Sequence, residues 1–171
     1  AEAAALVQRV KYPLPPGAEG ISGQRGSAFS TRAAGYGAFG GPAHTRRSNE
    51  GVTLVVMVET PEGVANAAAI AAAGASMLTV HARTKSDGYR PPAYWPWIAK
   101  IKQQVNIPLI ANGEIWTAAD ALLCQQQSDC TDIMLGRGAL AMPNLAQTIR
   151  DSSAVMPWAQ VLELLMQYSE F

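Results

Sequence analysis

The sequence predicts an α/β fold in which about five parallel strands alternate with helices. Strand-like runs begin near residues 18, 53, 77, 108 and 131, about 23–35 residues apart, and this spacing is typical of a parallel sheet with crossover helices. Hydrophobic residues make up 49% of the 171 residues and charged residues 15%, as in a folded domain rather than a disordered chain. We therefore expect a single α/β domain over residues 1–171.

The N-terminal residues predict a helix, a strand and a long loop. Residues 1–10 place apolar side chains at helical spacing on one face. The prolines and the glycine within residues 13–17 end this helix. We expect a short strand over residues 18–22. Residues 23–42 hold six glycines and show little periodicity, so they predict a loop.

The next unit is a strand followed at once by a helix. Residues 52–58 form a continuous, largely β-branched run, which is typical of a strand buried on both faces of a parallel sheet. Thr60 is a good N-cap residue and Pro61 suits the first helical position. Gly74 ends the Ala-rich run that follows, so we expect one helix over residues 60–74.

The same cycle recurs twice more. Residues 76–82 predict a strand, residues 83–92 a loop, and residues 94–105 a helix with apolar side chains on one face. The next strand is expected over residues 108–111, and a turn follows it over residues 112–114.

The C-terminal part continues the alternation of helix and strand. Residues 117–127 predict a helix, because Thr117 and Asp120 stand at the spacing of a capping box. Residues 131–135 predict the last strand. Two further helices are expected around Pro143 and Pro157.

This element order predicts a partial TIM-type (β/α) barrel. A complete eight-stranded barrel needs typically ~250 residues, so about five strands cannot close within one chain. The strands would then form an open sheet or be completed by oligomerisation, because exposed parallel edges invite pairing with other chains. We expect a homo-oligomer.

Charge and hydropathy exclude several partner classes. The chain has 13 Lys and Arg against 13 Asp and Glu, so no global basic field attracts nucleic acid or an acidic membrane. Residues 1–102 carry 11 basic and 6 acidic residues, and residues 103–171 carry 2 and 7, but the basic residues are scattered and indicate a solvated surface. No apolar run reaches the ~18 residues that span a bilayer, and no signal peptide is recognisable. We expect a cytoplasmic protein with no membrane partner.

The two cysteines, Cys124 and Cys130, have no His or Cys at metal-ligand spacing. They therefore predict free thiols rather than a disulfide framework or a zinc site.

The carboxyl ends of the expected strands are where function is expected in a parallel sheet. They carry Glu59, His81, Arg83 and the turns over residues 112–114 and 136–138. Glycine lets a backbone approach a phosphate closely, and Arg137 in the last turn adds a charge-assisted hydrogen bond. Glycine in a tight strand-to-helix turn is also simply what the turn geometry requires, so spacing alone leaves both interpretations open.

The other candidate functional side chains also allow two interpretations. His81 is either a donor to a ligand or a satisfied structural histidine. Glu59 is either a ligand for Mg²⁺ or a salt-bridged surface carboxylate, and no second carboxylate is identifiable close by. His44, Arg46 and Arg47 are best explained as a solvated basic cluster.

From about residue 74 to the C-terminus the chain resembles the C-type tRNA-dihydrouridine synthases. The segments that carry the resemblance are 78–85 with 88–90, 107–116, 133–140 with 143–145, and 156–158. The resemblance implies an FMN-dependent barrel that reduces uridine in tRNA with NADPH. It also implies that a set of strand-end residues contacts the flavin or its phosphate, namely His81, Arg83, Asn112, Gly113, Glu114, Gly136 and Arg137.

Part of that family's catalytic apparatus has no match in this chain. The family's general-acid cysteine and its lysine have no counterpart, because Cys124 falls inside an expected helix and Cys130 lies before an expected strand. The family's helical tRNA-binding domain is also not found by residue 171. We therefore expect no catalytic residue, no uridine reduction and no tRNA partner.

Residues 1–73 resemble the HpcH/HpaI group of metal-dependent aldolases. The matching segments are 10–13, 20–23, 32–36, 49–50 and above all 58–67. The resemblance implies that Glu59 is a ligand for Mg²⁺ or Mn²⁺. The partner aspartate is missing near residues 80–85, so we do not expect the metal to be bound.

These observations favour a chimeric (β/α)-barrel fragment, joined near residues 71–75, without catalytic turnover and with at most a residual FMN or phosphate site. The first alternative is an FMN-dependent oxidoreductase of the dihydrouridine synthase type that is completed by oligomerisation. Further alternatives are a metal-dependent aldolase and RNA binding through Arg83, Lys85 and Arg90.

Overall fold

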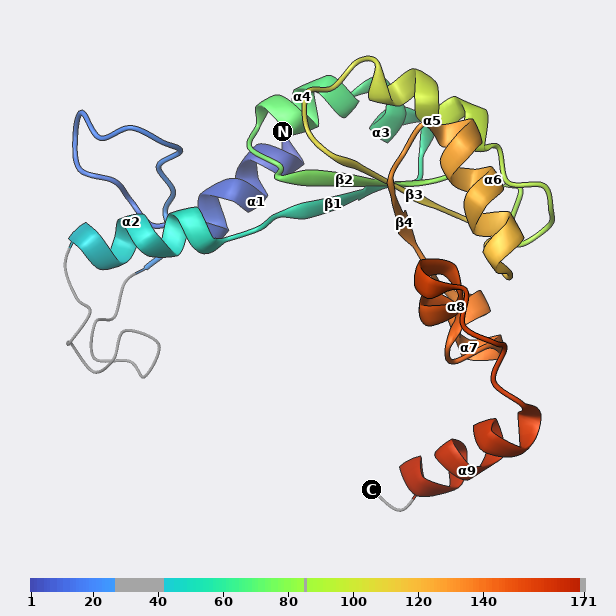
Figure 1. The fold of residues 1–171 in the computed structure, drawn as a ribbon. Coiled ribbons are helices and arrows are strands. Elements are labelled where there is room, and N and C mark those ends of the chain that lie inside the picture. The colour runs from blue at the N-terminus through green and yellow to red at the C-terminus, as the bar shows by residue number, and fades with distance from the viewer. Residues whose placement is uncertain (27–41, 85, 170–171) are drawn as a thin grey trace. The chain divides into compact units, whose positions relative to one another are not determined.

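The computed structural model describes residues 1–26, 42–84 and 86–169. Figure 1 shows the elements in chain order. The helices are α1 (Glu2–Val10), α2 (Pro42–Gly51), α3 (Pro61–Ala65), α4 (Ala67–Ala72), α5 (Trp95–Lys102), α6 (Ala118–Ser128), α7 (Arg137–Ala141), α8 (Leu145–Asp151) and α9 (Trp158–Tyr168). The strands are β1 (Val55–Val58), β2 (Met77–His81), β3 (Leu109–Asn112) and β4 (Asp132–Met134).

The strands form one open sheet in the order β1-β2-β3-β4. The pairing of β3 with β4 is parallel, with Ile110 opposite Asp132 and Asn112 opposite Met134. The fold class is therefore confirmed as α/β with an unclosed parallel sheet, as in a partial barrel. The prediction of a fifth strand is wrong, because the described residues form four strands.

The chain divides into two compact units. Unit 1 comprises Ala1–Val56, Ala65–Leu78 and Val105–Pro108, and unit 2 comprises Met57–Val64, Thr79–Gln104 and Leu109–Phe171. In unit 1, the end of α1 is tied to α2 by a buried pair of hydrogen bonds. The Tyr12 amide donates to Asn49 Oδ1 over 2.7 Å, and Asn49 Nδ2 donates back to the Tyr12 carbonyl over 2.9 Å.

The segment over residues 18–22 is not a strand. Gly17 and Gly20 have φ values of +80° and +112°, which a regular strand does not allow. The residues that follow bond to the end of α1 instead of to the sheet, since the Gly23 amide donates to the Tyr12 carbonyl over 3.0 Å. Most of the expected loop over residues 23–42 lies outside the described residues.

The expected helix over residues 60–74 is two short helices, α3 and α4. Asn66 separates them, with φ −101° and ψ 9°, and is the N-cap residue of α4. Asparagine is more common at helix caps than in helix interiors, because its side chain can form hydrogen bonds to nearby backbone groups that compete with those of the helix. At the C-terminal end, three helices rather than two follow β4.

Unit 2 contains β3 and β4, with α5 and α6 against them. Alternation along β3 assigns its two faces, because Leu109 and Ala111 are buried whereas Ile110 and Asn112 are only half-buried. Ile98 of α5 and Cys124 of α6 are fully buried in the core that these elements share. The half-buried face of β3 thus carries Ile110 and, at its carboxyl end, Asn112.

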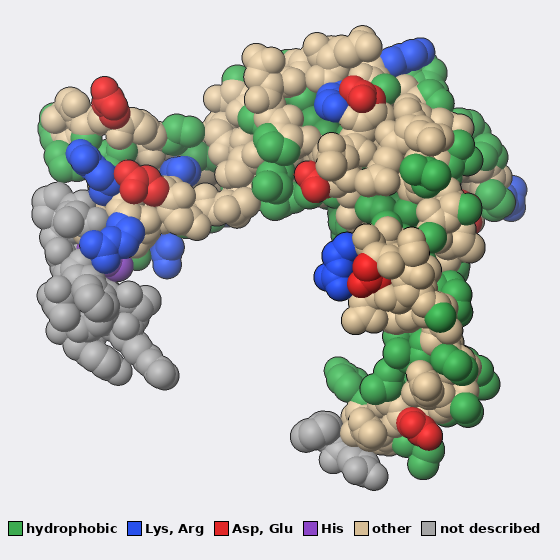
Figure 2. Space-filling model, viewed as in Figure 1, with side chains coloured by type: hydrophobic (Ala, Val, Ile, Leu, Met, Phe, Trp, Pro, Cys, Tyr) green, Lys and Arg blue, Asp and Glu red, His purple; other side chains and the backbone are tan. Residues whose placement is uncertain are grey.

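Helix α9 buries only Val161 among its described side chains. Its exposed apolar residues include Trp158, Leu165 and Met166, and Figure 2 shows apolar side chains over this helix. No helix in the described part of the chain is long and apolar enough to cross a bilayer.

Candidate functional site

A cavity of about 210 Å³ lies in unit 2 at the carboxyl ends of β2, β3 and β4. The carboxyl ends of parallel strands meet at one edge of a sheet, which explains why residues distant in sequence gather here. The cavity is lined by the seven strand-end residues that the sequence singles out, His81, Arg83, Asn112, Gly113, Glu114, Gly136 and Arg137.

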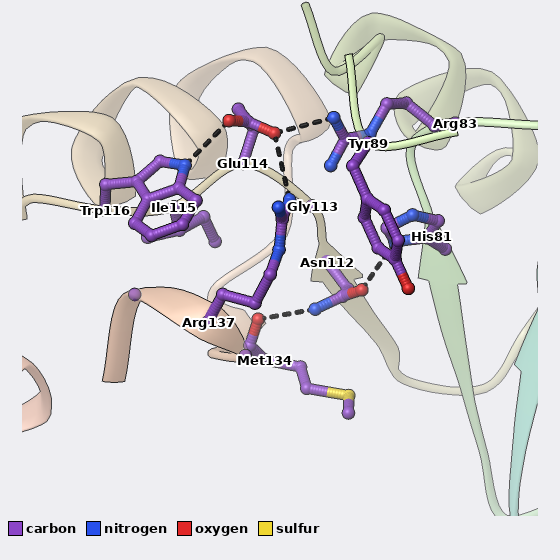
Figure 3. Close-up of a pocket in the computed structure, with 12 residues that line it drawn as sticks. His81, Arg83, Tyr89, Asn112, Gly113, Glu114, Ile115, Trp116, Met134 and Arg137 are labelled. Atoms are coloured by element: carbon purple, nitrogen blue, oxygen red, sulfur yellow. Dashed lines mark hydrogen bonds and ion pairs between the residues drawn. The ribbon is translucent and has the colours of Figure 1, made fainter. Parts of the chain in front are cut away.

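Side-chain hydrogen bonds connect the ends of the three strands (Figure 3). Nδ1 of His81 lies 2.6 Å from Oδ1 of Asn112, and Asn112 Nδ2 donates to the Met134 carbonyl over 2.8 Å. Since Nδ2 donates to a carbonyl, the amide oxygen is the acceptor and His81 Nδ1 carries the proton. In a neutral imidazole Nε2 is therefore left with a lone pair, and in a charged one it is a donor.

Glu114 is the centre of a second network. Its Oε2 lies 2.7 Å from Nη1 of Arg83 and 3.6 Å from Nη2 of Arg137. Its Oε1 accepts a hydrogen bond from Trp116 Nε1 over 2.7 Å. The Arg83 side chain is 1% exposed and the Glu114 side chain 19%, so the Arg83 charge is buried and compensated by Glu114.

The backbone of the β3–α6 turn needs a glycine. Gly113 has φ +122° and Glu114 has φ +55°. The first value is strained for any residue with a Cβ, whereas the second lies in the left-handed region that other residues enter at some cost. Trp95, the first residue of α5, donates from Nε1 to the Gly113 carbonyl over 2.9 Å. This buried bond fixes the orientation of the Gly113 carbonyl.

Two glycines, Gly136 at the N-cap of α7 and Gly138 within α7, have opposite surroundings. A Cβ built on Gly136 would meet no atom within 4 Å, although the residue lines the cavity. A Cβ on Gly138 would overlap the Ile115 carbonyl oxygen. Gly138 therefore allows close packing of two chain segments, whereas the space beside Gly136 is open.

The cavity favours an anion. Two arginines and one glutamate line it, so its fixed charge is positive even with His81 neutral. The Arg137 side chain is 44% exposed, whereas Arg83 is buried. Arg137 is thus the cation that an incoming ligand can reach, and its planar fork of N–H donors suits carboxylate or phosphate groups.

Glu59 does not line this cavity. It lines a second, mainly apolar cavity of about 580 Å³ in unit 2, together with Asp87. Hydrogen bonds from the Thr84 hydroxyl and amide lower the pKa of Asp87, so that carboxylate is already engaged. Among the described residues no three His, Cys, Asp or Glu side chains gather in a metal-binding arrangement. The structure thus gives Glu59 no metal site.

The two cysteines are free and buried. Desolvation raises the pKa of the Cys124 thiol to about 11, and the same cause raises the pKa of Cys130. Both are protonated at neutral pH and neither lines the strand-end cavity, which makes them poor candidates for acid catalysis there.

The hypothesis that Arg83, Lys85 and Arg90 bind RNA is not supported for Arg83. Arg83 is buried against Glu114 and donates to the Arg90 carbonyl over 3.1 Å, so it is not available to a phosphate backbone. Lys85 lies outside the described residues.

Sequence reasoning did not single out four other residues that line the cavity, Tyr89, Ile115, Trp116 and Met134. Tyr89 and Trp116 are aromatic residues within the segments that carry the family resemblance, next to the strand-end turns. Their position beside those turns is the sequence feature that could have identified them as residues of the cavity. Met134 contributes its carbonyl, which a sequence pattern does not reveal.

A family model described as dihydrouridine synthase (Dus) matches residues 56–168. The chain belongs to the dihydrouridine synthase family. A tRNA-dihydrouridine(16) synthase from Shewanella oneidensis is 49% identical over 105 residues, which are 61% of this chain and 33% of that protein. One from Ralstonia nicotianae is 47% identical over 114 residues, 64% of this chain and 35% of that protein. The chain thus spans about a third of the length of the curated relatives it matches.

The dihydrouridine synthase match changes the expected division of the sequence. It begins at residue 56 rather than 74, so it includes the segment 58–67 that carries the aldolase resemblance. The relatives give no support to an aldolase or to a junction of two enzymes near residues 71–75. A solved nitroalkane oxidase from Streptomyces ansochromogenes superposes with a TM-score of 0.38 and 23% identity over 55% of this chain and 29% of that one, which is too loose a likeness to argue from.

Proposed function

We propose that the strand-end cavity holds the phosphate of FMN and that the chain is the flavin-binding part of an FMN-dependent oxidoreductase of the dihydrouridine synthase type. The observation that carries the proposal is the cavity itself. In a member of this family, a positively charged cavity lies at the carboxyl ends of three parallel strands, between two glycine turns. This reading replaces the expected fragment without turnover as the main hypothesis.

The residues fit a phosphate group. The open space beside Gly136 accommodates ligand atoms that a side chain would displace. Arg137 brings an exposed guanidinium, and His81 Nε2 is not used by the hydrogen bonds that hold the ring. Donors of this kind are typical of phosphate sites.

Each side chain has a distinct role in this proposal. Arg137 binds the phosphate oxygens, and Asn112 fixes the ring of His81. Glu114 compensates the buried charge of Arg83 and holds its side chain in place. When bound, FMN supplies two-electron hydride transfer.

The substrate class that we propose for the whole protein is supported by the relatives, which are named tRNA-dihydrouridine(16) synthases. We extend the proposal to reduction of uridine in tRNA by the whole protein. The described residues place no thiol at the strand-end cavity. A proton donor of that kind would have to come from outside this set of residues.

The test is FMN binding by the purified chain, followed by flavin absorbance and fluorescence. Arg137→Gln should weaken FMN binding roughly tenfold or more, because a charge-assisted contact is worth about 1.5–3 kcal/mol. Arg150→Gln is the matched control, since Arg150 is an exposed arginine of α8 that forms an ion pair with Asp151 and does not line the cavity. An unchanged FMN affinity in Arg137→Gln, or an equal loss in Arg150→Gln, would overturn the proposal.

A further inference from the structure

We propose that Tyr89 and Trp116 are positioning residues that hold the Arg137 guanidinium for a phosphate monoester. The inference rests on the proposed function, because it explains how the phosphate-binding arginine of that site is kept in place. It assigns a role to two aromatic residues that do not need to touch the phosphate themselves.

Arg137 lies between two aromatic rings. Its Cζ is 4.5 Å from the centroid of the Tyr89 ring and 5.1 Å from the centroid of the Trp116 ring. Figure 3 shows the guanidinium between the two side chains. Both distances fall within the range of about 6 Å in which a cation is attracted to a ring.

Trp116 is itself held from two sides. Its Nε1 donates to Glu114 Oε1 over 2.7 Å, and its amide donates to Asp120 Oδ2 over 3.1 Å. Glu114 is in turn fixed by Arg83, which is buried. The indole is therefore anchored to the β3–α6 turn and to the capping box of α6, and it offers Arg137 a fixed surface.

The stacked arrangement leaves the N–H donors of Arg137 usable. A guanidinium stacks through its face, whereas its five N–H groups point outward in its plane. The contact with Glu114 is long, at 3.6 Å, so it does not saturate these donors. The rings thus restrict a long, 44% exposed side chain without occupying the groups that bind phosphate, which lowers the entropy lost on binding.

The test compares FMN with riboflavin, which lacks only the phosphate. The preference of the protein for FMN over riboflavin measures the phosphate site alone and is insensitive to general loss of flavin binding. We expect Trp116→Leu and Tyr89→Leu each to lower this preference roughly three- to tenfold, as the loss of a cation–π contact predicts. Tyr89→Phe should retain the wild-type preference, because it keeps the ring.

Trp158→Leu is the matched control. Trp158 is a tryptophan that is 64% exposed, belongs to α9 and lines neither cavity. It should leave the preference for FMN unchanged. Thermal unfolding of each variant checks that the fold is retained, and Tyr89→Leu stays informative even where Trp116→Leu does not fold, because Tyr89 is 75% exposed.

The outcomes separate the two proposals. A wild-type chain that binds FMN no better than riboflavin contradicts the phosphate site, and with it the proposed function. A wild-type chain that prefers FMN, together with a Tyr89→Leu variant that keeps the full preference, contradicts only the positioning role. A Tyr89→Phe variant that loses as much as Tyr89→Leu also contradicts it, because the ring would then not be the group that matters.

Discussion

His81 and Asn112 are joined side chain to side chain across two neighbouring strands, with Nδ1 of the imidazole 2.6 Å from Oδ1 of the amide. The same amide donates to the Met134 carbonyl on the next strand. The ends of β2, β3 and β4 are therefore connected through one asparagine. The bonds that connect them also orient the imidazole that lines the cavity.

Asn112→Leu should destabilise the protein and weaken FMN binding together. The substitution removes two hydrogen bonds and leaves their partners unsatisfied, which costs about 1–3 kcal/mol in the free energy of unfolding. It also frees the ring of His81, so FMN affinity should fall. Urea unfolding and flavin titration measure the two effects.

Asn144→Leu is the control for this prediction. Asn144 makes an equivalent pair of bonds, donating to the Ala154 carbonyl over 2.8 Å and accepting from the Met156 amide over 3.0 Å, and it lines neither cavity. It should lower stability but leave FMN affinity unchanged. A parallel loss of affinity in both variants would mean that Asn112 acts only through stability.

Glu114→Gln should cost about 2 kcal/mol or more in the free energy of unfolding. The variant leaves the Arg83 charge buried without its carboxylate, and breaking a buried pair is far more costly than breaking an exposed one. Partial exposure of Glu114 and the nearby Arg137 reduce the cost below that of a fully buried pair. Urea unfolding at low ionic strength provides the measurement.

The exposed ion pair of Lys102 and Asp129 provides the comparison. The Lys102 side chain is 40% exposed and the Asp129 side chain 80%, and Lys102 Nζ lies 3.0 Å from Asp129 Oδ2. Asp129→Asn should cost less than about 1 kcal/mol. Equal effects of the two substitutions would show that the Arg83–Glu114 pair behaves as a surface salt bridge.

Local signals in the sequence predicted much of the fold. Thr117 and Asp120 form the expected capping box, with the Asp120 amide donating to Thr117 Oγ1 over 3.1 Å. The strands expected from residue 52 onward are present. β1, β2 and β4 are shorter than expected, whereas β3 has the expected length and lies one residue later. The expected strand over residues 18–22 failed because short apolar runs beside glycine do not reveal whether a sheet edge or a helix end supplies their hydrogen bonds.

The candidate site was also partly predictable, for a topological reason. Parallel strands bring their carboxyl ends to one edge, so residues after each strand are expected to be neighbours. What the sequence could not reveal is which of them pair. Arg83 is buried against Glu114 whereas Arg137 stays exposed, and this difference depends on packing that no spacing encodes.

Stability should fall as the pH rises from about 9 toward 11, in part through the buried thiols. Burial raises the pKa of Cys124 from the ordinary 9.0 to about 11, so the folded state holds the thiol proton more tightly than the unfolded state. Its contribution is therefore fully present below pH 9 and is lost as the pH rises above it. Cys130 has its pKa raised in the same direction.

The measurement is the free energy of unfolding at several pH values between 8 and 11 for the wild type and for the variant Cys124→Ala with Cys130→Ala. The variant should be less stable at pH 8, because it leaves small cavities, but its stability should depend less steeply on pH. Parallel curves would contradict the assigned desolvation. Tyrosine and lysine titration is common to both proteins and cancels in the comparison.

Gly136 and Gly138 should respond to alanine in opposite ways. Ala at 138 must overlap the Ile115 carbonyl oxygen, so Gly138→Ala should destabilise the protein by about 1–3 kcal/mol, as overpacking does. Ala at 136 meets no atom within 4 Å. Gly136→Ala should therefore lower the free energy of unfolding by less than Gly138→Ala does. Gly136→Ala should nevertheless weaken FMN binding, because the added methyl group enters the space that we assign to the phosphate.

Gly136→Ala with unchanged FMN affinity would place the phosphate elsewhere, whereas a large loss of stability in Gly136→Ala would contradict the open geometry of the β4–α7 turn.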